Sequence, residues 1–276
     1  MKTIKYLLFK VLLLFVLASF VMCGKSKIDK TKTLDTVLWN GKKSAIALTY
    51  DDGLHVHLDN VRPILDTHNL KATFYVHTNS DSFQKRASEW KALAAHGHEL
   101  GNHTVFHPCA GKSKGREWVS AERDLDSYSK EEIIKEIANA SAVLSEIDGK
   151  LERTFAYTCG DTSVLDTSFV EEIKALFTAA RGVNRDFDDL GSLDLYHLNT
   201  HSMAGHDANH MKTLVDEAIE QGSLLVFLFH GVGGEHDLTV EKEDHDELVR
   251  YIKQKEGEIW VSSMVDIAAF IKETNR

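Results

Sequence analysis

Short apolar runs alternate with amphipathic helical patterns from residue 45 to the C-terminus, and this alternation constrains the fold more than any other feature of the sequence. The first run, residues 45–50 (AIALTY), is apolar almost without a break, as expected of a parallel strand that is covered on both faces. Repeated strand–helix units in one domain favour a parallel sheet that closes into a barrel. We therefore predict an α/β fold, a distorted, TIM-like (β/α) barrel with seven parallel strands. The predicted strands are residues 45–50, 72–76, 99–102, 153–157, 179–183, 196–199 and 224–229, and a last strand–helix pair lies at 259–262 and 265–272.

Helices are predicted between these strands. Ser129 and Glu132 form a capping box, which begins a long amphipathic helix that runs to about residue 147. The segment 107–128 is a long polar insertion, and loops of this length are usually functional or mobile. The other predicted helices are residues 58–67, 83–96, 168–177, 208–221 and 243–255.

The first residues have the features of a targeting segment rather than of a folded domain. Lys2 and Lys5 precede a mostly apolar stretch, and a polar run follows directly after Cys23. The uncharged part of that stretch is shorter than the roughly 20 residues that a membrane span needs. Cys23 lies where lipoproteins carry their lipidated cysteine, which favours a lipoprotein over plain secretion; a retained membrane anchor is the alternative. We expect an exported protein (a cell-envelope lipoprotein, or a periplasmic or secreted protein) that contacts a membrane only through an N-terminal lipid or signal anchor.

The remaining length fits one domain. The chain has 276 residues, and strand–helix barrels commonly need about 250 residues. No stretch rich in proline, glycine or serine follows the first thirty residues, so no linker is visible. We assign residues 1–23 to the signal peptide, 24–43 to an N-terminal tether and 44–276 to a single domain.

The net charge of −10 limits the class of partner. A protein that tracks nucleic-acid phosphates needs a basic surface, and no cluster of Lys and Arg stands out. We therefore expect no nucleic-acid partner. The same balance argues against a strongly anionic polymer as ligand, and a neutral one fits better.

Polar residues that can carry chemistry follow the predicted strands, at the ends where the chain leaves the sheet. Barrel enzymes place their active sites at the carboxyl ends of the strands, so these residues are expected to meet at one face. Surface polar residues without a common role would not sort in this way. The residues are Asp51, Asp52, His103, His107, Tyr157, Cys159, Asp161, Arg181 and His230.

Asp52, His103 and His107 form a set of one carboxylate and two imidazoles that suits a catalytic metal ion. Three protein ligands leave coordination positions open for water and substrate. The spacing of four between the two histidines suits a helical turn, which would bring both rings to one side. Such a set accepts several divalent ions. We expect zinc, with cobalt or nickel as alternatives.

Asp51 and Asp52 are adjacent and follow a buried strand directly. Neighbouring side chains of a strand point to opposite faces, but the chain can relax toward Gly53 at the strand end. Two carboxylates beside an apolar interior need a partner charge, which argues against a simple Asp-Asp-Gly turn. We expect the two to divide the labour, with Asp52 on the metal and Asp51 as a base.

The motifs around these residues resemble those of the polysaccharide deacetylases (carbohydrate esterase family four, chitooligosaccharide deacetylase-like). The family patterns T-F-D-D-G and H-[ST]-x-x-H are similar to TYDDG at residues 49–53 and to GHELGNHTVFH at residues 97–107. FAYTCG at residues 155–160 resembles a variant of the third motif, and FLFHG at residues 227–231 resembles the fifth. The closing EIWVSSMVDIAAFI is similar to the final strand and helix of the family, so the resemblance covers about residues 44–272.

This resemblance implies a metal-dependent hydrolase that removes acetyl groups from a carbohydrate, on a catalytic domain of residues 44–276. Asp51 would be the general base, and Asp52, His103 and His107 the metal ligands. The backbone N–H of Cys159 would help to hold the tetrahedral oxyanion. His230 would be the general acid that protonates the leaving group, a role that suits an imidazole near neutral pH.

The third and fourth motifs depart from the family pattern. Ala156 stands where much of the family has an arginine that pairs with the base. We propose that Arg181, at the next strand end, supplies this charge and keeps Asp51 ionised. The fourth motif is not recognisable. The candidates to orient His230 are Asp186, Asp188 and Asp189, with a solvated acidic loop as the alternative.

Three other functions were weighed. A glycosidase needs two separated carboxylates that flank a sugar bond, and the adjacent Asp51 and Asp52 cannot flank one. A non-catalytic carbohydrate-binding protein on a deacetylase scaffold would explain the altered motifs but not the intact set of acids and histidines. Between an O-acetyl esterase and an N-acetyl amidase the sequence does not decide, because the contacts to the leaving group lie in loops such as residues 108–128.

The remaining cysteines and histidines leave alternatives open. Export permits a disulfide between Cys109 and Cys159, and two free thiols are the alternative. A nucleophilic Cys159 paired with a histidine is conceivable, but nothing else in the sequence supports it. A further cluster could line the substrate cleft, bind a second ion or simply face solvent; it consists of His201, His206 and His210.

Overall fold

The computed structural model describes residues 39–274 of the chain. The expected signal peptide and most of the expected tether lie outside the described residues. Trp39, at the end of the expected tether, is fully buried, and its indole N–H donates to the Gly222 carbonyl at 2.8 Å. Residues 39–43 are therefore part of the packed domain. None of the helices within residues 39–274 is long and apolar enough to cross a membrane.

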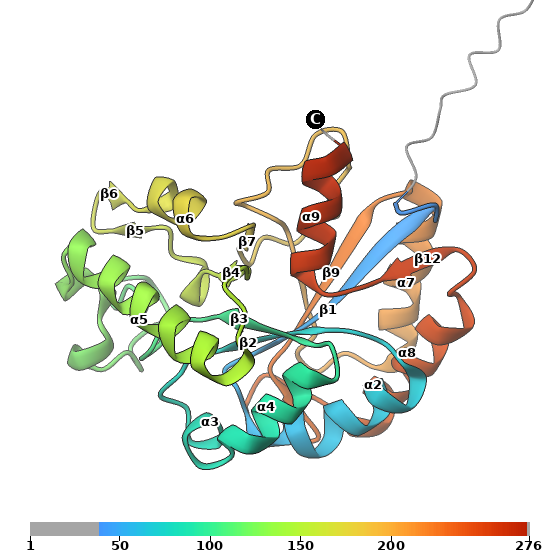
Figure 1. The fold of residues 1–276 in the computed structure, drawn as a ribbon, viewed down its shortest axis with the longest axis horizontal. Coiled ribbons are helices and arrows are strands. Elements are labelled where there is room, and N and C mark those ends of the chain that lie inside the picture. The colour runs from blue at the N-terminus through green and yellow to red at the C-terminus, as the bar shows by residue number, and fades with distance from the viewer. Residues whose placement is uncertain (1–38, 275–276) are drawn as a thin grey trace, which may run out of the picture. The chain divides into compact units, whose positions relative to one another are not determined.

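The domain is built on a parallel sheet that curls on itself (Figure 1). Its strands are β1 (Ser44–Asp51), β2 (Thr73–Val76), β3 (Glu99–Asn102), β4 (Phe155–Ala156), β7 (Ala180–Arg181), β8 (His201–Ser202), β9 (Leu224–Phe229) and β12 (Ile259–Val261). Seven of them follow the order β7-β4-β3-β2-β1-β9-β8, while β12 pairs with the start of β1, which β2 does not reach. A parallel bridge joins Arg181 of β7 to Leu198, in the segment that leads into β8. The predicted distorted barrel is confirmed.

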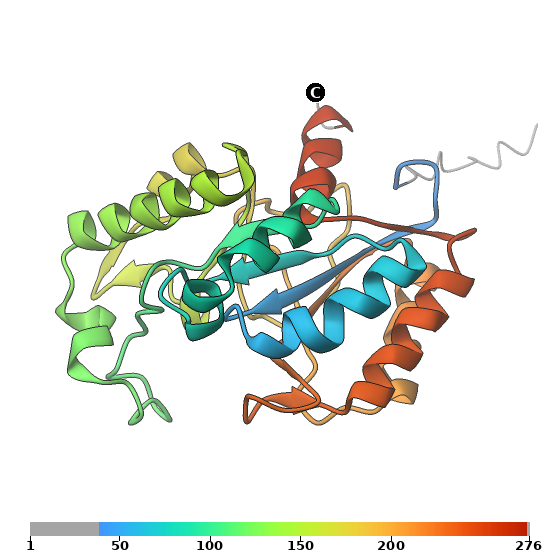
Figure 2. The ribbon, with the colours of Figure 1, turned by 60° about the horizontal axis from the view of Figure 1, so that its bottom comes forward.

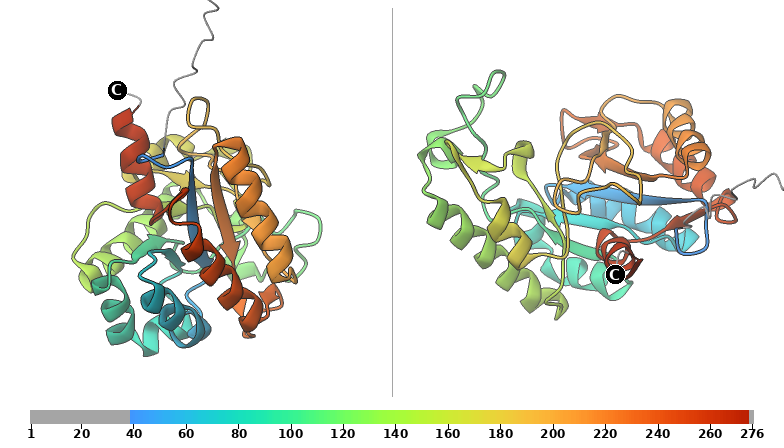
Figure 3. Two further views of the ribbon diagram at one scale, coloured as in Figure 1. Left: turned by 90° about the vertical axis from the view of Figure 1, so that its right-hand side faces the viewer. Right: turned by 90° about the horizontal axis from the view of Figure 1, so that it is seen from above.

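Helices cover the sheet on both sides. They are α2 (Arg62–His68), α3 (Asp81–Lys85), α4 (Ala87–Ala95), α5 (Lys130–Asp148), α6 (Val170–Leu176), α7 (Ala208–Gln221), α8 (Lys242–Gln254) and α9 (Met264–Thr274). Figure 1 shows α9 above the sheet and α2 and α4 below it. Figure 2 shows α2 and α4 in front of the sheet, and the left view of Figure 3 shows α7 and α8 packed side by side.

Side chains along β1 point alternately to the two faces of the sheet, so this strand contributes to two apolar clusters. Ile46, Leu48 and Tyr50 pack into the larger apolar cluster, together with residues of α2, α4, α7 and α8. The small side chains of Ala45 and Ala47 point the other way, into the cluster that α9 completes. All eight residues of the strand are buried, which agrees with the uninterrupted apolar run in the sequence.

The capping box that the sequence predicted for α5 is present. The Ser129 hydroxyl accepts the Glu132 N–H at 3.2 Å, and the Glu132 carboxylate accepts the Ser129 N–H at 2.7 Å. The helix ends at Gly149, whose φ of 72° suits a residue without a side chain. The capped α5 spans Lys130–Asp148, close to the predicted range.

The predicted strand at residues 196–199 is wrong. The carboxylate of Asp194 accepts the N–H of Tyr196 at 2.9 Å and pairs with the ring of His197 at 2.8 Å, which turns the chain there. Within the predicted range only Leu198 makes a β-bridge, to Arg181, and the strand itself forms after that range, as β8 at His201–Ser202. The short strand pairs β5 (Ser163–Val164) with β6 (Thr167–Ser168) and β10 (Gly231–Val232) with β11 (Thr239–Val240) were also not predicted.

Candidate active site

Seven of the nine polar residues singled out after the strands line one pocket of about 310 Å³, and Asp161 and Arg181 do not. Asp51 ends β1, Arg181 ends β7, and His103 and His230 follow β3 and β9 directly. A larger groove, of about 670 Å³, lies beside α5, but none of the strand-end candidates lines it. The smaller pocket is therefore the candidate site. It is lined by Asp51, Asp52, His103, His107, Trp118, Tyr157, Cys159, Val183, Ser202, Leu228, His230, His236 and Leu238.

Asp52, His103 and His107 have the geometry of a metal-ligand set. One ligand atom from each lies within 4.8 Å of the other two. Nε2 of His103 and Nε2 of His107 are 3.7 Å and 3.5 Å from the same oxygen, Oδ1 of Asp52. Ligand atoms around a tetrahedral zinc ion stand about 3.3 Å apart, given Zn–N distances of about 2.0–2.1 Å. The residues therefore fit a divalent ion.

A hydrogen bond from Nδ1 of His103 leaves its Nε2, the nitrogen that faces Asp52, free to bind an ion. Its Nδ1–H donates to the carbonyl of Ala156 at 2.9 Å, so the lone pair is on Nε2, which faces Asp52. Burial lowers the pKa of His103 well below its ordinary value, and the neighbouring His107 acts in the same direction. The ring is therefore neutral at pH 7, as a metal ligand requires.

The segment from His103 to His107 is a loop, so the predicted helical turn is wrong. The Asn102 side chain accepts the Thr104 N–H at 2.8 Å, and the Thr104 hydroxyl accepts the His107 N–H at 2.9 Å. Thr104 and His107 have φ values of 67° and 58°, in the left-handed region that non-glycine residues seldom occupy. Two local side-chain bonds thus bring the rings together without a helix.

The chain leaves the strand conformation between Asp51 and Asp52, which lets both acids face the pocket. Asp52 has a φ of 78° and Gly53 a φ of 64°. A side chain at Gly53 would meet the Val76 side chain at 2.9 Å, so only glycine fits there. Residues with such uncommon backbone angles cluster at functional sites, where the surrounding packing holds them in place.

Asp51 and Arg181 form a buried ion pair across the barrel. Nη2 of Arg181 donates to Oδ1 of Asp51, and the two side chains are almost inaccessible to solvent. The guanidinium also lies 4.5 Å from the centre of the Tyr75 ring. Burial raises the pKa of Asp51, and the charge of Arg181 opposes this rise. The arginine absent at Ala156 thus has a counterpart in contact with Asp51.

His230 lies against the acids but away from the three aspartates proposed to orient it. Asp188 accepts both N–H groups of Asn199, while Asp186 and Asp189 bond to backbone N–H groups of their own loop. Within residues 39–274, none of the three hydrogen-bonds to the His230 ring. Burial lowers the pKa of His230 below its ordinary value.

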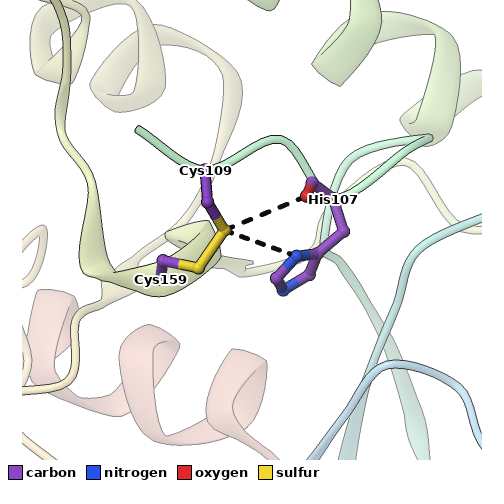
Figure 4. Close-up of side chains that lie close together, drawn as sticks. All are labelled: His107, Cys109 and Cys159. Atoms are coloured by element: carbon purple, nitrogen blue, oxygen red, sulfur yellow. Dashed lines mark hydrogen bonds between the residues drawn. A yellow bond between two sulfur atoms is a disulfide. The ribbon is translucent and has the colours of Figure 1, made fainter. Parts of the chain in front are cut away.

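A disulfide joins Cys109 to Cys159 and fixes two edges of the pocket (Figure 4). The Cys109 sulfur lies 3.6 Å from Nδ1 of His107, so the bridge packs against a candidate metal ligand. On the other side, Arg116 donates to the carbonyl of Cys159 at 2.8 Å and forms an ion pair with Asp161. With both thiols oxidised, a nucleophilic Cys159 has no support.

Cys159 lines the pocket, and its φ of 54° turns the chain sharply there. The carbonyl of Cys159, which belongs to the next peptide unit, accepts from Arg116. Within the described part of the chain, the N–H of Cys159 makes no hydrogen bond. A free N–H at the wall of a pocket can stabilise an oxyanion.

Removing the disulfide should destabilise the domain. The bridge closes a loop of 50 residues, for which loop-closure entropy predicts about 4 kcal/mol. We expect the double variant Cys109→Ser/Cys159→Ser to lose roughly this much free energy of unfolding in urea titrations of metal-free protein. A loss below about 1 kcal/mol would show that the native loops are already held by Arg116 and its bonds.

Among the pocket residues that the sequence did not reveal, two have side chains suited to a functional role. His236 lies in the loop between β10 and β11 with Nε2 at 3.6 Å from Oδ2 of Asp52, and Trp118 lies on the polar insertion with its side chain 63% exposed. Neither follows a strand, so the strand-end signal could not find them. The unusual tryptophan in a polar segment was the available signal for Trp118.

The second histidine cluster does not form a metal set. His206 and His210 stack with ring centres 4.4 Å apart, and His201 packs on Phe187. Among residues 39–274, no group of three metal-ligating side chains includes any of these histidines. A second ion at this cluster therefore has no structural support.

Comparison with known proteins agrees with the motifs. The polysaccharide deacetylase family model matches residues 40–176. The chain is 40% identical over 73 residues to the peptidoglycan-N-acetylglucosamine deacetylase of Bacillus cereus, which covers 25% of each protein. It is 32% identical over 150 residues to a gellan lyase of a Bacillus species, covering 54% of this chain and 5% of that protein. The chain thus spans a quarter or less of the length of these curated relatives.

Solved structures share the fold. A crystal structure assigned as a polysaccharide deacetylase of Mycobacterium smegmatis has a TM-score of 0.60, covering 85% of this chain and 92% of that chain at 14% identity. At this identity the likeness shows the fold alone. The family match is more specific, because residues 40–176 contain the first three motifs and β1, β3 and β4, three strands that lead into the pocket. Residues 40–176 of the chain belong to the polysaccharide deacetylase family.

Proposed function

We propose that this protein is a metal-dependent hydrolase that removes acetyl groups from a carbohydrate. One observation carries the proposal: the metal-ligand set, His230 and Asp51, which pairs with Arg181, line the same small pocket. The family membership supports a deacetylase. The metal and the substrate are our inference from the chemistry of the side chains.

Asp52, His103 and His107 would hold a divalent ion, with zinc as first choice and cobalt or nickel as alternatives. When bound, such an ion would act as a Lewis acid toward the acetyl carbonyl. As metal ligands, two imidazoles and one carboxylate carry a total charge of −1, which a divalent cation would compensate. The ion would also relieve the crowding of polar groups around Asp52, which is 14% exposed at its side chain.

The side chains of the pocket supply the remaining steps. Asp51 takes a proton from the attacking water, whose oxygen forms the new bond to the acetyl carbon. The Cys159 N–H donates to the oxygen that becomes negatively charged. His230 gives its proton to the departing sugar oxygen or nitrogen as the bond to the acetyl carbon breaks. Acetate and the free hydroxyl or amine are the products.

The rim of the pocket suits a neutral sugar. Trp118, Val183 and Leu238 are all lining residues with large exposed fractions, of 63%, 48% and 44%. Aromatic side chains bury the apolar faces of ligands while leaving polar groups in water. The acidic chain favours a neutral substrate over an anionic one.

Trp118→Ala should weaken binding rather than chemistry. We expect KM for an acetylated oligosaccharide to rise about tenfold, the equivalent of about 1.4 kcal/mol, with kcat nearly unchanged. Trp118→Tyr should restore most of the loss because it keeps an aromatic face. Steady-state kinetics on an oligosaccharide and on a small acetyl ester would test this, since only the larger substrate reaches the rim. An equal loss on both substrates would contradict the assignment.

We also propose that the domain works outside the cytoplasm, as an envelope lipoprotein or a periplasmic or secreted protein. The Cys109–Cys159 disulfide supports an oxidising compartment. Fractionation of cells that express the tagged full chain, with a Cys23→Ser variant for comparison, would test export and lipidation separately. Full-length precursor confined to the cytoplasm would contradict the proposal.

Acetate release tests the function directly. Purified protein would be stripped of metal, reloaded with zinc, cobalt or nickel, and given acetylated xylan and N-acetylglucosamine oligomers side by side. We expect release only from the reloaded protein, and the panel that responds distinguishes ester from amide hydrolysis. Metal binding without release from either panel would favour a carbohydrate-binding protein.

A further inference from the structure

We propose that His236 is a positioning residue, which donates a hydrogen bond to the second oxygen of Asp52 and packs against His230. The inference deepens the proposed function and rests on it. His236 lies outside every motif that the sequence comparison used, in the loop between β10 and β11. It lines the pocket with its side chain about one third exposed (32%).

The backbone of this loop fixes where the His236 ring can lie. Gly231 N–H donates to the Leu238 carbonyl at 3.1 Å, and Gly233 N–H donates to the Val240 carbonyl at 2.8 Å. The carboxylate of Glu235 reaches across to accept the Val56 N–H at 2.8 Å. The loop is therefore tied to itself and to the segment that follows β1.

One hydrogen bond determines which nitrogen of His236 carries the proton. The N–H of Leu238 donates to Nδ1 of His236 at 2.9 Å, so Nδ1 is an acceptor and holds a lone pair. In a neutral ring the proton is then on Nε2. Nε2 is the atom that faces Oδ2 of Asp52, at 3.6 Å. His236 therefore presents a donor, not a metal-binding lone pair, to the pocket.

The two oxygens of Asp52 consequently have different surroundings. Oδ1 faces the free nitrogens of His103 and His107, and Oδ2 faces the N–H of His236. At 3.6 Å the His236 contact is about 0.6 Å longer than an ordinary N–H···O bond, and catalytic hydrogen bonds are often long before a ligand binds. A donor on Oδ2 would hold the carboxylate so that Oδ1 alone binds the ion. Outer partners of this kind typically change metal affinity by about 10–100-fold.

His236 also restrains the proposed general acid. The rings of His236 and His230 stack with centres 4.8 Å apart and planes at 20°. The backbone carbonyl of His230 accepts a bond from Nε2 of His57 at 2.8 Å, which fixes the main chain but leaves the ring free to rotate. Since none of the three aspartates proposed to orient His230 hydrogen-bonds to its ring within residues 39–274, we take the flat face of His236 as a restraint on that ring.

Two substitutions separate these roles. His236→Gln keeps an N–H near the Nε2 position but removes the ring, whereas His236→Phe keeps the ring and removes the donor. We expect His236→Phe to weaken Co²⁺ binding by about 10–100-fold and to change the visible absorption of the bound Co²⁺. His236→Gln should bind Co²⁺ within a few-fold of wild type, but its kcat should fall because His230 loses its packing.

Isothermal titration and absorption spectra of the metal-free full chain with Co²⁺ provide the readouts, beside acetate release. His55→Phe is the matched control, because His55 also pairs with an aspartate and is 33% exposed but does not line the pocket. Thermal melting by circular dichroism excludes misfolded variants. Wild-type Co²⁺ affinity and spectrum in His236→Phe would overturn the inference, even if wild-type protein releases acetate. Conversely, weaker Co²⁺ binding in His236→Phe with no acetate release by wild type would sink only the deacetylase proposal.

Discussion

Asp51→Asn is expected to lower kcat/KM for acetate release by about 10²–10⁴-fold, the range that a positioned general base contributes. Asparagine has the shape of aspartate and its carbonyl can still accept from Arg181, but it cannot take a proton from water. The ion pair would be lost while the packing stays, and Co²⁺ affinity should change little because Asp51 is not in the ligand set. Kinetics and Co²⁺ titration on the same preparation would measure both.

Asp52→Asn is the matched control, since it changes the neighbouring acid in the same way. This variant should lose metal affinity as well as activity, whereas Asp51→Asn should lose activity alone. If both variants lose metal affinity equally, Asp51 would be a ligand and the division of labour between the two acids would be wrong. His103 Nε2 lies 3.8 Å from Oδ2 of Asp51, which makes this outcome a real alternative.

Arg181 should act through Asp51, and pH dependence shows the direction. Burial raises the pKa of Asp51 and Arg181 opposes the rise, so removing the cation should raise that pKa further. The acidic limb of kcat/KM should therefore move to higher pH in Arg181→Met, with Arg181→Lys in between. A double-mutant cycle with Asp51→Asn should show coupling, because the second change removes the group on which the first acts. Additive losses would contradict this assignment.

The second large effect is expected for His230→Ala, which should lose activity by about a hundredfold or more while Co²⁺ binds normally. The ring is not a member of the ligand set, and its proposed task is to protonate the leaving group. That task matters only when the leaving group is a poor one. The loss should therefore be large for a sugar acetate or acetamide and small for an aryl acetate.

Comparison of the two substrate types makes this test specific. An acid that protonates the leaving oxygen or nitrogen is not needed when a phenolate departs, so the aryl ester should be cleaved at nearly the wild-type rate. Equal losses on both substrates would mean that His230 has another role, such as orienting water. Retained turnover on the sugar substrate would refute the assignment altogether.

The amino-acid sequence was sufficient to predict the sheet and the face on which the site lies. A parallel strand covered on both faces must be apolar throughout, so β1 and β9 are recognisable in the sequence as uninterrupted apolar runs. The polar site residues directly after these strands are recognisable because they end the runs. The ranges predicted for β3, α7 and β9 agree with the structure residue for residue. These features depend on local composition, which a single chain displays directly.

Local side-chain bonds were harder to predict because they compete with regular structure. The Asp194 turn displaced a predicted strand, and the bonds of Asn102 and Thr104 replaced a predicted helical turn. In both cases one short polar side chain offers the backbone a partner that periodicity does not reveal. The histidines nevertheless meet, since their convergence depends on where the strand ends and not on a helix.

Contacts between distant segments required the tertiary structure. Arg181 and Asp51 are 130 residues apart, and the structure brings them together because the sheet curls until β7 faces β1 across the barrel. The choice between a disulfide and two free thiols likewise depended on the distance between two loops. His236 had no signal in the sequence. Its proposed role depends on two contacts of the folded chain: the Leu238 N–H donates to Nδ1 of the ring, and Nε2 faces Oδ2 of Asp52. Sequence alone thus determined the long strands of the sheet and the polar residues directly after them, because both depend on local polarity. Curvature of the sheet and closure of the loops decided which of those residues touch, because such contacts arise only when the whole domain packs.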